Sequence, residues 1–570
     1  MCGIAGAFSF SSNLLVGVEK VKLMTDSIAH RGPDGEGIWQ NANSHLVLGH
    51  RRLAIIDLSD LSNQPMIDNS GKFVIVFNGE IYNFCELKEQ LISLGCNFFS
   101  HSDTEVLLNL YIRFGESCLQ MLDGMFAFVI YDTENDKLFC ARDRFGEKPF
   151  YYVVRDGEFV FASEIKAIKA YYSNLSIDIE KLQRYINGDY WYGDLDTPFN
   201  EVVSLSPASY MTVDASGLKL KKYWDIDLNK KCTLVSDIEY YEKFQELFLK
   251  SVKMRLRSDV PVGSSLSGGL DSSAVVGSLS CLGEVDNHTF SARFKSNKDE
   301  GKWIADVVEK HNVSSHEVWP AENGLIDDID RITWHNEFPL ASASVFAQWC
   351  VMAVPRKYGV KVLLDGQGAD EFLCGYDELK YYAIWDLFRT GKFSSFFKEK
   401  KMFDAYYGSH GKLGFMFVFD GLLKQFGIKR KVYENGFTLK EQLKFYTQHK
   451  LGELLRYADR NSMANSIEVR LPFLSHELVE FVFSIPDDLI YREGKTKFIL
   501  REAMKKVLPD SVYNRTNKIG FAPPQNDWVN SEVFQNKYKE VADVLNTVGL
   551  VPGSDQFRNL AASVFVKLYR

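Results

Sequence analysis

The stretch that decides the fold reads VPVGSSLSGGLDSSAVVGSL and spans residues 260–279. An apolar run leads into the small-residue loop 267–273, and a helical pattern follows. A strand, a small-residue loop and a helix start together favour phosphate binding, because backbone amides, hydroxyls and the helix dipole all attract an anion. The alternative is a tight strand-to-helix turn whose serines cap the helix. The loop matches neither the Walker pattern nor GxGxxG, and its Asp271 makes sense if it holds Mg²⁺.

A second acidic loop follows another strand-like run further along the chain. The segment KVLLDGQGADEFLCGY, residues 361–376, passes from apolar residues into Asp365 and then Asp370. Ligands gather at the carboxyl ends of parallel strands, so Asp370 is expected to face Asp271 across a shared magnesium–pyrophosphate. The alternative is a turn with solvated acids.

The chain begins MCGIAGAF, which places a cysteine directly behind the initiator methionine. If methionine is removed, Cys2 carries both a thiol nucleophile and a free α-amine, and the amine can act as its general base. The alternative is an ordinary free cysteine. This stretch alone leaves both open.

Composition indicates a large multidomain protein. A chain of 570 residues exceeds the size at which one core keeps growing. The net charge of −9 argues against a nucleic-acid-binding face. The nine cysteines are scattered and include no CxxC pair, which favours reduced thiols and a cytoplasmic protein. No apolar run approaches the ~18 residues of a membrane span, and no secretory leader precedes Cys2, so we expect no membrane association.

The pattern of apolar residues changes along the chain. Residues 1–212 contain short β-branched or aromatic runs between turn residues, which predict a mostly antiparallel α+β domain. Residues 213–235 are polar and lysine-rich and are interpreted as a linker. From residue 236 onward strand-like and helical segments alternate, which predicts a parallel-sheet α/β domain with a helical C-terminal part. The first helix of this domain is expected to bury one face, formed by Ile238, Tyr241, Phe244, Phe248 and Val252.

Taken together, the motifs resemble a known family. SGGLDSS is similar to the pyrophosphate loop of ATP pyrophosphatases. Further matching segments occur in family order: MCGI, HRGPDG, RRLAIID, FNGEIYNF, SDTEVL, GMFAF, RDRFGEKPFYY, LRYADRNSMANSIEVRLPFL, GKTKFILREAM and NRTNKIGFAPP. The whole chain thereby resembles the glutamine-dependent asparagine synthetases. The resemblance implies an N-terminal-nucleophile hydrolase sandwich (αββα) for residues 2–212 and an adenine-nucleotide hydrolase-like domain for residues 236–570.

The resemblance implies roles for residues of the first domain. Cys2 would attack the glutamine side-chain amide, and ammonia would leave. Arg52 would clamp the glutamine α-carboxylate, a task suited to a planar guanidinium, and Asp103 would pair with its α-ammonium. Asn78, Gly79 and Glu80 belong to the NGE motif, whose first two residues would stabilise the oxyanion, and Arg31 would support the nucleophile. By its residues alone, VIVFNGEIY also fits a hairpin with a type I′ turn at Asn-Gly.

For the second domain the resemblance implies ATP-dependent activation of a carboxylate to an acyl-AMP, followed by displacement of AMP by channelled ammonia. The implied ATP-binding residues are Leu266, Ser267, Gly268, Gly269, Asp271, Ser272, Ser273, Ala292, Asp365 and Gly366. Asp271 and Asp370 would hold Mg²⁺, and Lys497 would neutralise charge on the acyl phosphate. The alternative for Lys497 is a solvated surface lysine. Arg515 and Lys518 would add phosphate contacts.

The chain departs from the family where the acceptor would bind. Gln367 replaces the glutamate associated with activating aspartate, and an amide cannot take a proton. The segment EFPLASASVFAQW, residues 337–349, lacks the arginine expected for reading aspartate. The leading hypothesis is an asparagine synthetase acting on glutamine, ATP and aspartate, and the resemblance implies a homodimer, which is common in the family. The alternatives are amidation of another carboxylate, such as a sugar uronate, and a catalytically dead sensor; a β-lactam- or lasso-type cyclase is disfavoured because such relatives lack the N-terminal cysteine.

Overall fold

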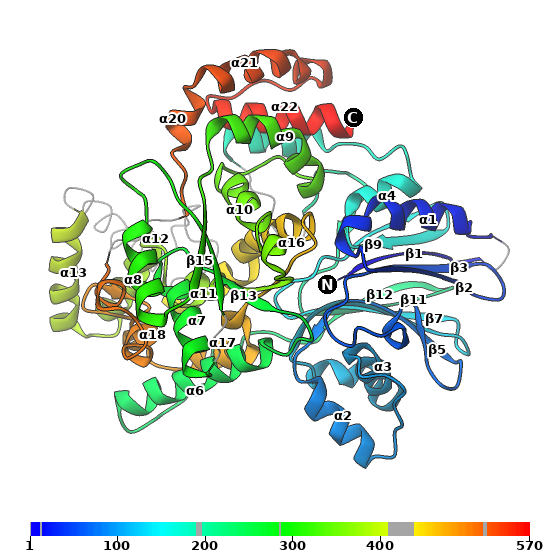
Figure 1. Cartoon of the computed structure of the whole chain (residues 1–570), viewed down its shortest axis with the longest axis horizontal. Coiled ribbons are helices and arrows are strands. Elements are labelled where there is room, and N and C mark those ends of the chain that lie inside the picture. Colours follow the sequence, from blue (N-terminus) through cyan, green and yellow to red (C-terminus); the bar gives the residue numbers. More distant parts are fainter. Residues whose placement is uncertain (1, 12–13, 190–195, 284–286, 408–437, 517–520) are drawn as a thin grey trace.

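The computed structural model describes residues 2–11, 14–189, 196–283, 287–407, 438–516 and 521–570. Two regions share the chain, an N-terminal one built on antiparallel sheets and a C-terminal one built on a parallel sheet (Figure 1). Within the described residues, no helix combines the length and apolar character that crossing a membrane requires.

The N-terminal region stacks two antiparallel sheets between two helical layers (Figure 1). The first sheet has the order β10-β8-β9-β1-β3-β2, and α1 and α4 cover it; the second has the order β12-β11-β7-β6-β5-β4, and α2 and α3 cover it. The strands are β1 (Gly3–Ser9), β2 (Gly35–Gln40), β3 (Leu46–Arg52), β4 (Met66–Ile67), β5 (Phe73–Ile81), β6 (Gly124–Asp132), β7 (Lys137–Arg142), β8 (Tyr151–Arg155), β9 (Glu158–Ala162), β10 (Val203–Ser204), β11 (Ser209–Asp214) and β12 (Gly217–Lys222). The covering helices are α1 (Val18–Ser27), α2 (Phe84–Ser93), α3 (Asp103–Phe114) and α4 (Ile165–Tyr171). This arrangement is the αββα sandwich predicted from the sequence.

Alternating side chains from the two sheets build the core of the sandwich. Ile4 and Phe8 of β1 meet Val76 of β5 and Val129 of β6 in one buried cluster. Successive strand residues point to opposite faces, so the remaining apolar set of each strand packs under its helical layer. The outer face of each sheet is therefore also apolar, and the helices bury it.

The second sheet continues into the segment predicted to be a linker. Strand β12 (Gly217–Lys222) pairs with β11 from Ser209↔Lys222 to Asp214↔Gly217. Its residues are mostly exposed, as expected at the edge of a sheet, and three lysines keep that edge polar. The polar composition of this segment therefore reflects an edge strand as well as a connection.

The C-terminal region contains a five-stranded parallel sheet of order β15-β14-β13-β16-β17. Its strands are β13 (Val262–Ser265), β14 (His288–Ala292), β15 (Ser314–Val318), β16 (Val362–Leu364) and β17 (Glu468–Arg470). The chain order reverses between β13 and β16, and an open parallel sheet binds ligands at such a point. The loops after these two strands are the two acidic loops that the sequence singled out.

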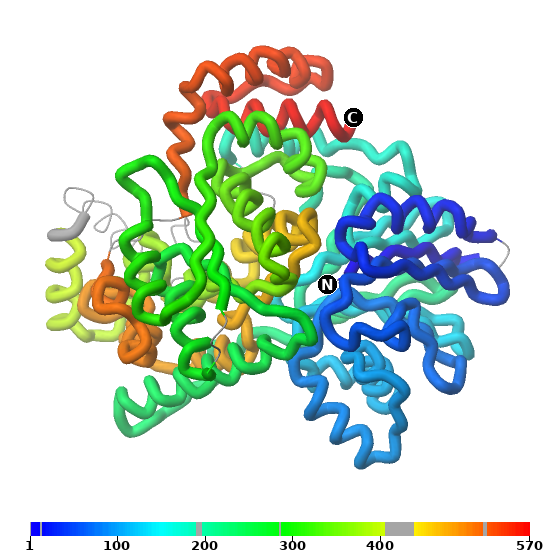
Figure 2. Tube along the Cα trace, in the orientation of Figure 1, coloured from blue at the N-terminus to red at the C-terminus, as the bar shows by residue number. Residues whose placement is uncertain are grey.

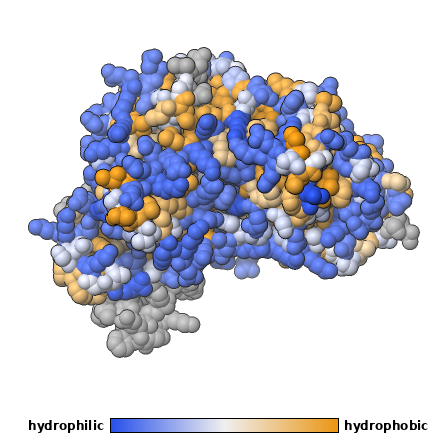
Figure 3. Space-filling model, turned by 90° about the horizontal axis from the view of Figure 1, so that it is seen from below, coloured by the Kyte–Doolittle hydropathy of each residue, from blue (hydrophilic) through white to orange (hydrophobic). Residues whose placement is uncertain are grey.

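Helices surround this sheet and form the C-terminal part of the chain, as predicted. They are α6 (Asp237–Arg255), α7 (Leu270–Cys281), α8 (Gly301–His311), α9 (Glu322–Asn336), α10 (Ser344–Met352), α11 (Ala369–Phe372), α12 (Asp377–Arg389), α13 (Phe393–Tyr407), α15 (Leu439–Phe445), α16 (Leu451–Met463), α17 (His476–Ser484), α18 (Phe498–Ala503), α19 (Asp510–Tyr513), α20 (Gln525–Val529), α21 (Glu532–Val541) and α22 (Gln556–Tyr569). Figure 2 shows the last helix at the C-terminal end of the chain. Its Phe565 and Tyr569 pack on Phe199 of the N-terminal region. Hydrophilic side chains cover most of the face in Figure 3, and apolar ones lie in scattered groups.

The face predicted for the first helix of this region is partly wrong. Phe244, Phe248 and Val252 are buried in α6, but Ile238 is 63% exposed. Tyr240 and Leu247 complete the buried stripe instead. The stripe 240, 244, 247 and 251 follows helical spacing, and residue 238 lies about 200° away from residue 240 around the helix.

Candidate active sites

The first candidate site surrounds Cys2 at the start of β1. The backbone N–H of Cys2 donates to Oδ1 of Asn78 at 3.0 Å, and both side chains are buried. Asn78 and Gly79 lie within strand β5, opposite Ala127 and Phe126 of β6. The hairpin-turn interpretation of this segment is therefore wrong, because β5 continues through Asn78-Gly79 to Ile81.

The hydrogen bond from the Cys2 N–H fixes which end of the Asn78 amide is engaged. With Oδ1 engaged, the buried Nδ2 of Asn78 has no hydrogen-bond partner among the described residues. A buried donor without a partner is costly unless something arrives to accept from it. The amide therefore presents a hydrogen-bond donor beside Cys2.

The remaining residues predicted for this site gather around the same thiol. Burial raises the pKa of Cys2, while a hydrogen bond from the Leu53 backbone and the charge of Arg52 oppose that rise and Glu80 adds to it. Nη1 of Arg52 donates to Oδ1 of Asn63 at 2.9 Å and to the carbonyl of Ser59 at 2.8 Å, which fixes the guanidinium.

The buried carboxylates of Asp103 and Glu80 belong to the same site. Oδ2 of Asp103 accepts from the N–H of Ile81 at 2.9 Å, so the first residue of α3 is tied to the end of β5. Burial raises the pKa of Asp103 to about 6. Burial and the charge of Glu468 raise the pKa of Glu80 well above its usual range. The structure thus brings together every residue that the sequence assigned to the glutamine site.

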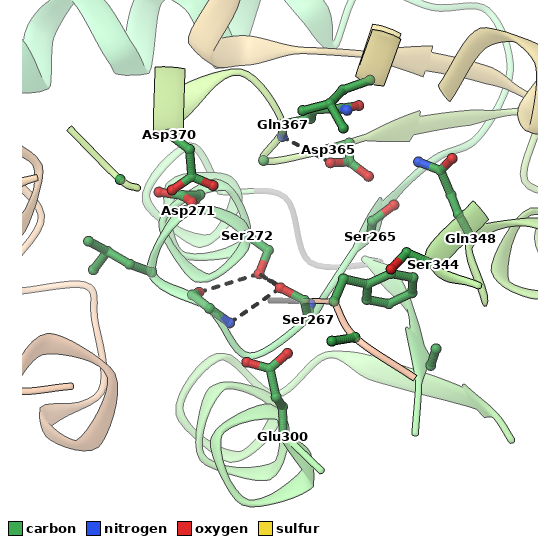
Figure 4. A pocket seen from close by; sticks show the side chains of 18 of the residues that line it. Ser265, Ser267, Asp271, Ser272, Glu300, Ser344, Gln348, Asp365, Gln367 and Asp370 are labelled. Carbon is green, nitrogen blue, oxygen red and sulfur yellow. Dashed lines mark hydrogen bonds between the residues drawn. The ribbon is translucent and has the colours of Figure 1, made fainter. Parts of the chain in front are cut away.

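The second candidate site begins at the loop between β13 and α7. Its hydroxyls bond within the loop: Ser267 Oγ lies 3.1 Å from Ser272 Oγ and accepts from the N–H of Gly269 at 3.3 Å (Figure 4). Gly268 has φ +73°, a left-handed conformation that favours glycine. Helix α7 begins after Gly269 without a side-chain cap. The serines therefore shape the loop rather than cap the helix.

The two acidic loops meet as predicted, with a lysine between them. Nζ of Lys497 lies 2.5 Å from Oδ2 of Asp271 and 2.6 Å from Oδ1 of Asp370. Lys497 is only 5% exposed, so the surface-lysine alternative is wrong. Burial opposes the charge of Lys497, but the two carboxylates outweigh it and hold its pKa above the usual range. A second ionic contact joins Arg515 to Glu300 at 2.7 Å, whereas Lys518 lies outside the described residues.

Close backbone contact fixes the distance between the loops. A Cβ on Gly366 would lie 2.7 Å from the N of Ser272 and 2.9 Å from the C of Asp271. Only glycine allows this approach. Asp365 caps its own turn by accepting from the N–H of Gln367 at 3.0 Å (Figure 4).

These loops line one cavity of about 650 Å³, a volume typical of a ligand site. Most residues predicted for ATP and metal line it: Leu266, Ser267, Gly269, Asp271, Ser272, Ala292, Asp365, Gly366, Asp370 and Lys497. Gly268 and Ser273 do not. The carbonyl of Gly268 accepts from Arg515 at 3.1 Å, and the Ser273 hydroxyl donates to the carbonyl of Gly269 at 2.6 Å.

Comparison with known proteins identifies the family. The profile described as "Glutamine amidotransferase domain" matches residues 1–224, and the profile described as "Asparagine synthase" matches residues 243–548. The chain belongs to the asparagine synthase family. It is 32% identical to asparagine synthetase [glutamine-hydrolyzing] 1 of Bacillus subtilis, an alignment that covers 94% of this chain and 88% of that protein.

Two further relatives are a second asparagine synthetase and a protein named as an amidase. The chain is 30% identical to asparagine synthetase [glutamine-hydrolyzing] 3 of Bacillus subtilis, over 90% of this chain and 86% of that one. It is 31% identical to amidase chry2 of Gibberella zeae, over 89% and 85%. The chain is an ATP-dependent ligase that takes its nitrogen from glutamine.

Sequence reasoning pointed to the segment 337–349 on the far side of the large cavity but named none of the residues that line the cavity there. Ser342, just before α10, and Ser344 and Gln348 of α10 line it together with Glu453 and Tyr457 of α16. Figure 4 shows Ser344 and Gln348 at the cavity. The Tyr457 hydroxyl donates to Oε1 of Glu453 at 3.0 Å. Helical spacing of 453 and 457 was the only available signal, and it fits any amphipathic helix.

The donor set between the two acidic loops suits magnesium in an asparagine synthase. Among the described residues, no group of three or more His, Cys, Asp or Glu side chains is arranged to hold a metal. Mg²⁺ is commonly held by one or two carboxylates together with substrate phosphates and water. Asp271 and Asp370, both within 2.6 Å of one ammonium, provide that pair.

Proposed function

We propose that this chain is a glutamine-dependent asparagine synthetase that makes asparagine, glutamate, AMP and PPi from aspartate, glutamine, ATP and water. Residues 2–212 would hydrolyse glutamine, residues 236–570 would form the amide, and residues 213–235 would connect them. The observation that carries the first half is the buried Asn78 amide beside Cys2, with its oxygen bonded to the nucleophile's backbone and its nitrogen without a described partner.

The residues of the first site suit acyl transfer from glutamine. Removal of Met1 would leave Cys2 with a free α-amine that takes the thiol proton. The thiolate would attack the glutamine amide carbon, and Nδ2 of Asn78 with the N–H of Gly79 would donate to the oxygen as it gains charge. Ammonia would leave, and water would cleave the thioester. Arg52 would bind the α-carboxylate of glutamine, and Asp103 would bind its α-ammonium.

The residues of the second site suit adenylation of a carboxylate. The backbone of the loop 267–273 and the start of α7 would bind the phosphates of ATP. Asp271 and Asp370 would hold Mg²⁺, which when bound neutralises phosphate charge. Lys497 already lies between these carboxylates. Its ammonium would therefore neutralise the negative charge that develops on pyrophosphate as it leaves. Ammonia would then attack the acyl carbon and release AMP.

Amidation of another carboxylate is the second candidate, and the cavity supplies its reason. The described residues of α10 and α16 that line the cavity include no lysine or arginine for the α-carboxylate of aspartate. They offer hydroxyls, the Gln348 amide and the Glu453 carboxylate instead. Gln367, which lines the same cavity, cannot accept a proton. A polyhydroxylated acid such as a sugar uronate fits such a lining.

One experiment separates these functions. Purified protein is supplied with glutamine and Mg-ATP and with either aspartate or a panel of uronic acids, and AMP, PPi and the amide product are measured. Asparagine formation supports the proposal, whereas AMP release only with another acid supports the second candidate. In parallel, Cys2→Ala should abolish synthesis from glutamine and retain synthesis from ammonium chloride. Loss of both activities in a folded variant would contradict two separate sites.

A further inference from the structure

A buried ionic cluster joins the two regions, and apart from the supporting role that the family resemblance implies for Arg31, neither proposed half-reaction uses its members. Its members are Arg31, Glu164 and Lys166 of the N-terminal region and Glu337, Asp459 and Arg460 of the C-terminal region. All six residues are at most 5% exposed. Charges are costly to bury, so a cluster of this size at an interface needs well-made ion pairs.

Arg31 connects this cluster to the nucleophile. Its Nε donates to the backbone carbonyl of Cys2 at 3.0 Å. Its Nη1 and Nη2 donate to Oδ2 and Oδ1 of Asp459 at 2.8 and 3.0 Å, a two-pronged pair. Such a pair fixes orientation as well as distance. Burial opposes ionisation of Asp459, but the charge of Arg31 holds its pKa below the usual range. An unbroken series of bonds thus runs from Cys2 through Arg31 to Asp459.

Asp459 lies on the helix that also lines the large cavity. Glu453 and Tyr457 of α16 face that cavity. Asp459 follows Tyr457 by two residues, which places it about 200° around the helix, on the opposite side. Helix α16 therefore has the acceptor side of the cavity on one face and the support of Cys2 on the other. Figure 1 shows α16 near the N-terminal end of the chain.

We propose that Asp459 is a positioning residue for glutamine hydrolysis: it holds Arg31, and Arg31 holds the backbone of Cys2, so α16 sets the position of the thiol against Asn78. This inference rests on the proposed role of Cys2. Acyl transfer is sensitive to placement, and an error of 1 Å in a reacting group costs about 100-fold in rate. The carbonyl carbon of Cys2 is bonded directly to the Cα that carries the thiol side chain. Loss of the hydrogen bond to this carbonyl would therefore let the thiol shift.

The test compares two charge-removing substitutions within the same cluster. Asp459→Asn breaks the two-pronged pair with Arg31. Glu337→Gln removes an equally buried charge, but Glu337 bonds Arg460 at 3.0 Å and the backbone N–H groups of Ile165 and Lys166. Glutamate release from glutamine is measured without ATP, to give kcat and KM. Thermal midpoint and Mg-ATP affinity are measured as checks that each variant is folded.

The D459N variant is expected to lose about tenfold or more in kcat, with KM for glutamine and Mg-ATP affinity within about threefold of the wild type. The E337Q variant is expected to retain kcat within about threefold, and D459E, which restores the charge, to recover most of the loss. An unchanged kcat in D459N, or equal losses in D459N and E337Q, would overturn the inference. If D459N does not fold, Arg31→Lys tests the same link, because lysine lacks the fork; the same loss in kcat is expected, and an unchanged kcat would be decisive against it. Absence of glutamate release by the wild type would instead refute the proposed function.

Discussion

Replacing Lys497 with methionine removes the ammonium that two carboxylates share. At an effective dielectric of about 20, one charge pair at 2.5 Å attracts with about 7 kcal/mol. Desolvation of the three groups offsets most of that attraction. Removing one partner of a buried ion pair still costs about 3–5 kcal/mol, because the remaining carboxylates lose one of the positive charges beside them. The side chains of Asp271 and Asp370 keep 19% and 22% of their surface exposed, so the lower end, about 3 kcal/mol, is expected.

The pH dependence of this loss has a definite sign. The folded-state pKa of Lys497 is raised above its ordinary value, since Asp271 and Asp370 outweigh burial. Its stabilisation is therefore fully present below the unfolded-state pKa of about 10.4 and is lost as pH rises through the folded-state pKa. The difference in stability between the wild type and K497M is expected to stay constant from about pH 6 to 9.

Thermal unfolding at a fixed scan rate measures the effect. A loss of about 3 kcal/mol lowers the midpoint by roughly 4 °C for a region as long as residues 236–570. The matched control is Lys506→Met, an exposed lysine of the same segment, which should shift stability by less than about 0.5 kcal/mol. Mg²⁺ is expected to raise the midpoint of K497M more than that of the wild type, because a divalent cation fits between the same carboxylates. A midpoint within 1 °C of the wild type (roughly 0.7 kcal/mol or less), or an equal response to Mg²⁺, would refute this account.

Three further predictions concern the two sites. Asn78→Ala should lower glutamine hydrolysis by about 100- to 1,000-fold, since it removes an oxyanion donor; synthesis from ammonium should remain, and a loss of both would count against the role. Burial raises the pKa of Asp103 to about 6, so KM for glutamine should rise as pH falls below 6, when the carboxyl is neutral; in Asp103→Asn that pH dependence should vanish. Gly366→Ala places a Cβ 2.7 Å from the Ser272 nitrogen, so equilibrium dialysis should show Mg-ATP affinity at least tenfold weaker, with glutamine hydrolysis unchanged.

The sequence predicted the fold correctly where the local residue pattern agrees with the tertiary packing. The short apolar strands of residues 1–212 and the strand-loop-helix at 260–279 led to the correct sheet types, because alternation and turn residues act over a few positions. It failed for the Asn78-Gly79 segment, where a favoured turn dipeptide lies in mid-strand. Nine consecutive pairs between β5 and β6 outweigh the preference of two residues. It also misjudged Ile238, because which side of a helix is buried depends on where its neighbours lie.

The sequence by itself determined which chemical groups this chain carries: a thiol near the N-terminus, the amide of Asn78 in the NGE motif, and two acidic loops after apolar strands. Residue types decide what bonds can be made, and the order of motifs is visible without a structure. Only the tertiary structure decided which groups share an environment. Lys497 lies 226 residues from Asp271 and Asp459 lies 428 from Arg31, yet the members of each pair are in direct contact, and the second pair is fully buried. Burial and pairing depend on contacts between distant segments, and no local pattern in the chain encodes them.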